Sequence, residues 1–304
     1  MIYDVVIIGA GPAGLAAGIY GKRAGLNVLV LDTSSISGGQ ILSTYEIDNY
    51  PGFPGVSGTE LAESMRSHCD KLGVQFARGR VSAINEKDGL KELVTKKETF
   101  TTKTVIIATG ASNTKLGCPG EEELSGVGVS YCATCDGAFF KDKEVAVVGG
   151  GDVALEDAIY LARFCKKVYL IHRRDEFRGA QVLQQQVMAT DKIEIIYDST
   201  VESINGESQV ESINIYNKKT SDNRSLPVEG IFIAVGTTPN TNSISGLPAS
   251  DEKGYIVADE TCVTSIPGIF VAGDARAKQL RQVITATADG ANAITSIEKY
   301  LQAK

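Results

Sequence analysis

The residues most able to carry out chemistry in this chain are two cysteines separated by two residues. The segment reads Cys132-Ala133-Thr134-Cys135. Such a pair suits either a redox-active dithiol or half of a zinc site. Zinc usually needs about four ligands, but the chain has no second Cys-x-x-Cys and only two histidines, His68 and His172. The sequence therefore favours the dithiol, and we expect no metal site.

Asp136 follows the second cysteine and is the nearest titratable side chain in the sequence. A helix N-terminus at this point would lower the pKa of a thiol and supply the reactive thiolate. Reduction of a disulfide requires a proton for a departing sulfur, and we predict that Asp136 provides it. The alternative is that Asp136 only caps a helix. The predicted catalytic residues are thus Cys132, Cys135 and Asp136.

A glycine-rich motif near the N-terminus, Gly9-Ala10-Gly11-Pro12-Ala13-Gly14, matches the pattern GxGxxG. The first glycine permits a tight turn, the second lets the backbone approach a pyrophosphate, and the third lets helix and strand pack closely. Asp32 ends the next apolar run, where an acid accepts hydrogen bonds from ribose hydroxyls. We predict a dinucleotide site, and the alternative is a glycine-rich turn without a ligand.

A second motif of this kind runs from Gly149 to Ala154 and reads GGGDVA. Here the next apolar run ends in His172-Arg173-Arg174, with Arg178 four positions on. Arginines offer bidentate donors to a 2′-phosphate, whereas an acid would repel it. We therefore predict a site that prefers NADP, and the alternative is a solvated basic surface.

The elements around both motifs have the order strand, glycine turn, helix, strand. The first unit of this kind has strands at 5–8 and 27–31 and a helix at 15–24, and the second has strands at 145–148 and 168–171 and a helix at 154–164. Further strands are expected at 104–110, 230–236 and 268–275. We predict an α/β protein with two Rossmann-like dinucleotide-binding domains, the second inserted into the first. The expected domains are 1–114 with 241–304, and 115–240.

Length and charge narrow the class of protein. The 304 residues suit about two domains, and a net charge of −7 argues against a nucleic-acid partner. The apolar runs are shorter than the roughly 20 residues of a membrane span, and no signal-peptide pattern is found. We therefore expect no membrane contact and a cytoplasmic location. The other cysteines, Cys69, Cys118, Cys165 and Cys262, are expected to be inert.

Taken together, these motifs resemble the low-molecular-weight, bacterial-type thioredoxin reductases among the pyridine nucleotide-disulfide oxidoreductases. The resemblance covers about residues 2–300. It rests on the segment CATCDG after the first fingerprint and before the second, on HRRxxxR, and on the late turn Gly273-Asp274-Ala275. Shorter matches are GGQ at 38–40, NYPG at 49–52, ATG at 108–110 and Arg281-Gln282.

The resemblance implies FAD at the first site, NADPH at the second, a homodimer, and thioredoxin or a thioredoxin-like protein as partner. The cofactor-binding positions that it implies in the first domain are Gly9, Gly11, Pro12, Ala13, Gly14, Asp32, Thr33, Gly38, Gly39, Gln40, Asn49, Val81, Thr109, Gly110, Gly273, Asp274, Arg281, Gln282 and Val283. Those in the second domain are Gly149, Gly151, Asp152, Ala154, His172, Arg173, Arg174 and Arg178.

The resemblance also implies roles for the redox segment. Cys135 would lie nearer the flavin, Cys132 would attack the partner, and Phe139 and Phe140 match an aromatic pair near the partner surface. Val127 stands where many relatives carry a basic residue, which bears on how the partner docks. The family moves one domain against the other during turnover. A ferredoxin-dependent reductase or a small-molecule dithiol oxidase of the same fold is the alternative function.

Overall fold

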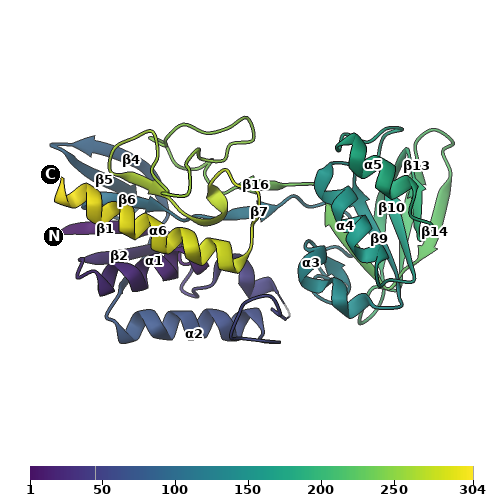
Figure 1. Ribbon diagram of the computed structural model, residues 1–304, viewed down its shortest axis with the longest axis horizontal. Coiled ribbons are helices and arrows are strands. Elements are labelled where there is room, and N and C mark those ends of the chain that lie inside the picture. The colour runs from purple at the N-terminus through teal and green to yellow at the C-terminus, as the bar shows by residue number, and fades with distance from the viewer. Residues whose placement is uncertain (45, 304) are drawn as a thin grey trace. The chain divides into compact units, whose positions relative to one another are not determined.

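The protein is described by a computed structural model that covers residues 1–44 and 46–303. The chain forms two compact units, the first of Met1–Ser112 with Thr238–Lys304 and the second of Asn113–Thr237. Two short strands, β7 (Ala111–Asn113) and β16 (Thr237–Pro239), connect them and pair with each other (Figure 1). The second unit is therefore inserted into the first.

The first unit is built on a seven-stranded sheet in the order β3-β2-β1-β6-β5-β4, with β17 also paired to β6. Strands β3, β2, β1 and β6 are parallel, whereas β4 and β5 form an antiparallel hairpin. The elements are β1 (Ile2–Ile8), α1 (Pro12–Arg23), β2 (Val28–Asp32), η1 (Gly39–Ser43), α2 (Gly58–Lys71), β3 (Gln75–Arg78), β4 (Val81–Lys87), β5 (Leu90–Thr95), β6 (Thr99–Ile107), β17 (Ile269–Val271), η3 (Gly273–Ala275) and α6 (Val283–Gln302).

The second unit repeats this plan with a five-stranded parallel sheet in the order β11-β10-β9-β15-β8. A separate three-stranded antiparallel sheet, β12-β13-β14, belongs to the same unit. The elements are β8 (Val129–Ser130), α3 (Ala133–Asp136), η2 (Gly137–Phe140), β9 (Glu144–Gly149), α4 (Asp152–Ala162), β10 (Lys167–Ile171), α5 (Gln181–Met188), β11 (Ile193–Ile196), β12 (Ser199–Asn205), β13 (Ser212–Asn217), β14 (Asn223–Pro227) and β15 (Gly230–Ala234).

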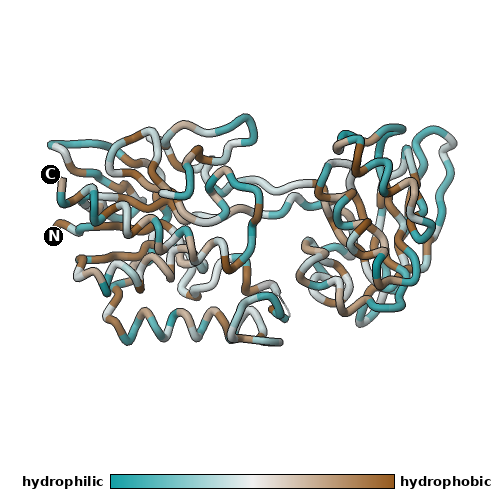
Figure 2. Tube along the Cα trace, in the orientation of Figure 1, coloured by the Kyte–Doolittle hydropathy of each residue, from teal (hydrophilic) through white to brown (hydrophobic). Residues whose placement is uncertain are grey.

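The central parallel strands of each unit are buried on both faces, and alternate residues of such a strand point to opposite sides. In β1, Val5 and Ile7 pack towards α1 and α6, while Val6 and Ile8 pack towards the β4–β5 side. In β9, Val145 packs towards α4 and α5, and the next residue towards β12–β14. Apolar strands accordingly occupy the interior of each unit in Figure 2. These continuous apolar runs made the parallel strands predictable.

The strand order around each glycine turn is the same, β3-β2-β1-β6 in the first unit and β11-β10-β9-β15 in the second. This is the order of one half of a Rossmann fold. The predicted fold class, with two such domains and the second inserted, is confirmed. No helix of the described residues is long and apolar enough to cross a membrane.

Candidate functional site

The redox segment lies in the second unit, where Cys132 and Cys135 form a disulfide with their Cα atoms 5.3 Å apart. Cys132 is the N-cap of α3, a helix of only four residues. The carbonyl of Cys132 accepts the N–H groups of Cys135 at 3.2 Å and Asp136 at 3.1 Å. These bonds form the tight turn that brings the two sulfurs together.

Ser130 links the carboxyl group of Asp136 to the backbone of this turn. The Ser130 hydroxyl donates to Asp136 Oδ2 at 2.6 Å and accepts the N–H of Cys132 at 3.1 Å. Burial raises the pKa of Asp136, and the bond from Ser130 acts in the opposite direction. Although Asp136 is the N-cap residue of η2, its side chain makes no capping hydrogen bond. The Asp136 carboxyl is therefore bonded to Ser130 and does not cap the helix.

The aromatic pair after this segment is divided between core and surface. Phe140 is 8% exposed and packs edge-on against Phe232, with ring centroids 5.2 Å apart. Phe139 is 43% exposed, and so is Val127. Of the two aromatic side chains, Phe139 is thus the one available to a partner.

The first glycine turn lies at the carboxyl end of β1. A Cβ atom on Gly9, whose φ is 111°, would lie 2.3 Å from the carbonyl oxygen of Ala108, so this position admits only glycine. A Cβ on Gly11 would meet nothing nearer than 3.9 Å, which leaves open space beside the backbone at the start of α1. Asp32 fixes the turn by accepting the N–H of Ala10 at 2.5 Å.

Several predicted positions of the first unit contact one another. Gly39 lies against Gly11, since a Cβ on Gly39 would be 3.3 Å from the Cα of Gly11. Asn49 donates to Gln282 Oε1 at 3.0 Å, directly before α6. Val81 differs from them, because its side chain is buried in the apolar core, so only its backbone could meet a ligand.

Three buried side-chain atoms lack a hydrogen-bond partner within the described part of the chain: Thr109 Oγ1, Asp274 Oδ1 and Arg281 Nε. All three belong to the positions predicted to bind the first cofactor. Burial raises the pKa of Asp274, against the positive charges of Lys278 and Arg281. Since buried polar groups are almost always hydrogen-bonded, these donors and acceptors fit a polar ligand that a dinucleotide would supply.

The second glycine turn is closed by the segment after β10. The Arg178 N–H donates to the Gly150 carbonyl at 2.8 Å, and the Ala180 N–H donates to Asp152 Oδ1 at 2.7 Å. This return of the chain brings the arginine segment to the turn. Arg173, Arg174 and Arg178 are exposed, and none of them has an ion-pair partner within the described residues.

The side chain of His172 packs against the backbone of this turn. It is 5% exposed, and a Cβ on Gly150 would lie 2.2 Å from its ring. Burial, more than the nearby Arg178 and Arg173, lowers the pKa of His172. A neutral, buried imidazole packed on the backbone shapes the turn, whereas the arginines are the groups free to meet a phosphate.

Two residues of these sites were not found from the sequence. Ser130 bridges Asp136 and Cys132, as described above. Asn240 donates its N–H to the Gly110 carbonyl at 3.0 Å and its side-chain amide to the Thr109 carbonyl at 3.1 Å, which fixes the turn that carries Thr109. Neither lies in a motif whose spacing implies its contact.

Comparison with known proteins gives the same assignment. The family model described as pyridine nucleotide-disulphide oxidoreductase matches residues 3–290. The chain belongs to this family. Family membership implies flavin and nicotinamide cofactors, and the predicted resemblance is confirmed.

Individual relatives are thioredoxin reductases. That of Listeria innocua is 45% identical over 99% of this chain and 94% of its own length. The crystal structure of the enzyme from Streptococcus pyogenes is 44% identical, covers 100% of this chain and 99% of its own, and has a TM-score of 0.94. A ferredoxin-flavin thioredoxin reductase from Clostridium acetobutylicum is 32% identical over 100% of this chain and 99% of its own, with a TM-score of 0.54.

Proposed function

We propose that this chain is a thioredoxin-disulfide reductase that binds FAD in its first unit and takes electrons from NADPH bound in its second. The observation that carries the proposal is the Cys132–Cys135 disulfide with the half-buried Asp136 linked to the same turn through Ser130. The relatives named above are thioredoxin reductases, which supports thioredoxin, or a thioredoxin-like protein, as the partner. When bound, FAD would accept an electron pair from the nicotinamide and deliver it to the disulfide.

We propose that FAD is held by residues around the first glycine turn. Backbone N–H groups at the start of α1 would face the pyrophosphate. Asp32 would accept ribose hydroxyls, and the unpartnered Thr109, Asp274 and Arg281 atoms would bond the remaining polar groups. The full set is the one that the resemblance implies.

The cysteines would then act by thiol–disulfide exchange. Two electrons and two protons convert the Cys132–Cys135 bond into two thiols, and Asp136 would hold one of these protons close to the departing sulfur. The thiolate of Cys132 attacks the partner's disulfide, which forms a mixed disulfide and releases one thiol of the partner. Cys135 then attacks Cys132 Sγ, which restores the internal disulfide and releases the reduced partner.

Coenzyme choice is assigned to the exposed arginines after β10. We propose that the 2′-phosphate lies beside the second glycine turn and meets the exposed side chains of Arg173, Arg174 and Arg178. A well-made hydrogen bond to a charged group contributes about 1.5–3 kcal/mol, so two contacts are enough for roughly 100-fold discrimination. We therefore expect NADPH to be preferred over NADH by at least about 100-fold in kcat/KM.

The test is an anaerobic titration of the purified, yellow protein with NADPH and, separately, with NADH, followed by oxidised thioredoxin. The proposal expects bleaching of the flavin spectrum by NADPH and its recovery when thioredoxin is added. Equal efficiency with NADH would contradict the assigned coenzyme. Faster reduction by ferredoxin, or no reaction with thioredoxin, would favour the ferredoxin-dependent reductase or the small-molecule dithiol oxidase instead. Homodimerisation and a cytoplasmic location also stay predictions.

A further inference from the structure

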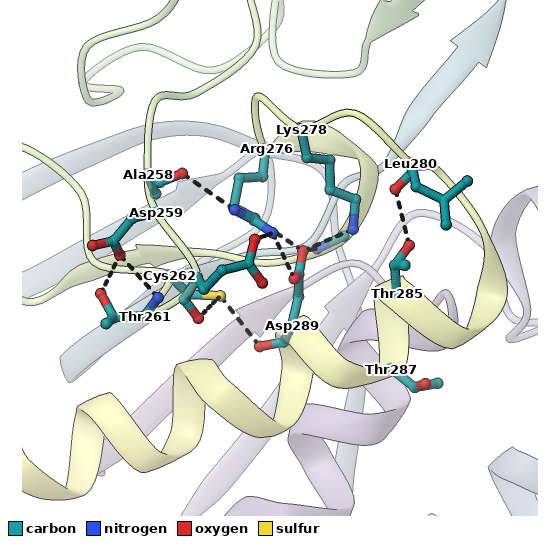
Figure 3. Close-up of polar contacts among 12 residues, drawn as sticks. Ala258, Asp259, Thr261, Cys262, Arg276, Lys278, Leu280, Thr285, Thr287 and Asp289 are labelled. Atoms are coloured by element: carbon teal, nitrogen blue, oxygen red, sulfur yellow. Dashed lines mark hydrogen bonds and ion pairs between the residues drawn. The ribbon is translucent and has the colours of Figure 1, made fainter.

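A buried cluster of charged side chains lies behind the turn Gly273-Asp274. Its centre is Asp289 of α6, which is 2% exposed. The Asp289 carboxylate accepts hydrogen bonds from Arg276 Nη2 at 3.0 Å, Arg276 Nε at 3.1 Å and Lys278 Nζ at 2.9 Å. Figure 3 shows both cations reaching this carboxylate from the loop that precedes α6. Both cationic side chains are only 5% exposed.

The cluster is joined to the predicted cofactor site by the backbone. Asp289 Oδ2 also accepts the N–H of Gly273 at 2.9 Å, the residue directly before Asp274. A Cβ on the next residue, Gly290, would lie 2.3 Å from the Ala13 carbonyl, so α6 crosses α1 in close contact at this point. Through these contacts Asp289 fixes the position of the backbone at Gly273-Asp274 relative to the first glycine turn.

The charges of the cluster bear directly on Asp274. Asp274 Oδ1 is buried and has no partner within the described residues. The positive charges of Lys278 and Arg281 act on its carboxyl, as does the negative charge of Asp289. Lys278 therefore has two carboxylates within electrostatic reach, and in the structure its ammonium group bonds to Asp289.

We propose that Asp289 is a positioning residue that holds Lys278 away from Asp274, so that the Asp274 carboxylate stays free to accept a hydroxyl of the bound flavin cofactor. Without the charge of Asp289, the ammonium group of Lys278 pairs with Asp274 and occupies the acceptor that the cofactor needs. Arg276 has further partners in the Ala258 carbonyl at 3.3 Å and Glu260 at 2.9 Å, so it stays in place. The inference rests on the proposed FAD site.

The experiment measures the Kd of FAD by fluorescence titration of flavin-depleted full-length protein. Asp289→Asn keeps the shape of the side chain and an oxygen for the Gly273 N–H but removes the charge. We expect it to raise the Kd by about 10- to 100-fold, the range for a lost hydrogen bond to a charged group. Adding Lys278→Met should return the Kd to within about 3-fold of that of Lys278→Met alone, since the competing cation is gone.

The matched control is Asp289→Asn with Arg276→Met, which also removes one buried cation but leaves Lys278. The inference expects this double variant to bind FAD as weakly as Asp289→Asn. Equal rescue by both second changes would show that charge balance alone matters and would overturn it. An unchanged Kd in Asp289→Asn would also overturn the inference. So would failure of both double variants to fold, because Asp289 would then be needed for folding. If the wild-type protein binds no FAD, the proposed function itself fails.

Discussion

At the scale of single residues, a short chain of hydrogen bonds ties the carboxyl of Asp136 to the redox turn. Ser130 links Asp136 Oδ2 to the N–H of Cys132. Burial favours the protonated carboxyl, while the bond from Ser130 favours the ionised one. A carboxyl balanced in this way can hold a proton beside a sulfur and then release it.

Replacing Asp136 by asparagine tests the proton role. We expect Asp136→Asn to slow thioredoxin reduction by about 10- to 1000-fold, the usual effect of a lost acid–base group, while reduction of the flavin by NADPH stays nearly unchanged. Stopped-flow measurement of both half-reactions separates the two. Asparagine is itself a good cap, so wild-type rates in both half-reactions would leave Asp136 a structural role only.

Ser130→Ala is the companion change. Loss of the bond that stabilises the carboxylate should raise the pKa of Asp136. The disulfide half-reaction should then stay fast to a higher pH than in the wild type, because a general acid works only while it is protonated. A pH profile that is lowered at every pH without being displaced would contradict this assignment.

The two cysteines are expected to differ in what they bind. In Cys135→Ser, Cys132 can attack a partner but no thiol can release it. A thioredoxin that lacks its own second cysteine, with its remaining thiol joined in a mixed disulfide to an aromatic thiol, should therefore form a covalent complex with Cys132 and release the aromatic thiol. In Cys132→Ser this complex should be nearly absent. Non-reducing electrophoresis after mixing distinguishes the variants, and the opposite pattern would exchange the two roles.

Asp157 on α4 is a half-buried acid that no motif indicated. It lies about one helical turn before Tyr160, whose ring, with that of Phe164 after the helix, packs at Gly137, directly after Asp136. Burial, with a smaller contribution from Glu156, raises the pKa of Asp157 to about 7. In the unfolded chain an aspartate ionises near pH 4, so between about pH 4 and 7 the folded protein retains a proton that the unfolded chain has lost. Stability should therefore fall as the pH rises through this window.

Asp157→Asn should remove this loss. Between pH 4 and pH 7 the free energy of unfolding of the variant should rise relative to that of the wild type by at least about 1 kcal/mol, because one unit of pKa corresponds to about 1.4 kcal/mol. Above pH 7 the difference between the two proteins should not increase further. Denaturant unfolding of both proteins across this pH range measures the difference. A gain that does not depend on pH would place the pKa of Asp157 near its ordinary value.

At the scale of elements, the central parallel strands and the two glycine turns could be predicted because their signals are local. Val5 to Ile8 is a continuous apolar run, and its neighbouring glycines permit one kind of turn. The sheet β12-β14, helix α6 and the parallel strands β3, β8 and β11 were not predicted. The residues of α6 are held by contacts distant in sequence, such as Gly290 against Ala13, and no local pattern encodes these. The same holds for Ser130 and Asn240, whose roles arise only from the folded contacts.

Helix α2 shows a local signal that is readable once the helix is known. Ser57 Oγ accepts the N–H of Glu60 at 3.2 Å, and the Glu60 carboxylate accepts the N–H of Ser57 at 3.0 Å, which forms a capping box. Ser57→Ala should lower the free energy of unfolding by about 1 kcal/mol. Ser67→Ala, at an exposed position inside the same helix, is the control and should change it by less than about 0.5 kcal/mol. Equal effects in denaturant titrations would mean that the cap does not stabilise α2.

At the scale of the whole molecule, the insertion of one unit into another of the same strand order places the two nucleotide turns on separate frameworks. The Cys132–Cys135 disulfide belongs to the inserted unit, together with the arginines proposed for NADPH. The side chains proposed for FAD belong to the other. The chain thus has two places to store an electron pair, one on a cofactor and one in its own sulfurs.

The number of electron pairs that each chain accepts can be measured by titration. Anaerobic titration of the wild-type protein with NADPH should consume about two equivalents per chain, one pair of electrons for the flavin and one for the disulfide. The double variant Cys132→Ser/Cys135→Ser should consume about one, because it retains the flavin but has no disulfide to reduce. Absorbance at the flavin band gives the end point, and labelling of free thiols before and after titration is the independent control. If the wild type also takes up one equivalent and gains no thiols, electrons do not pass to Cys132 and Cys135, and the proposed reductase function is wrong even though a flavin is bound.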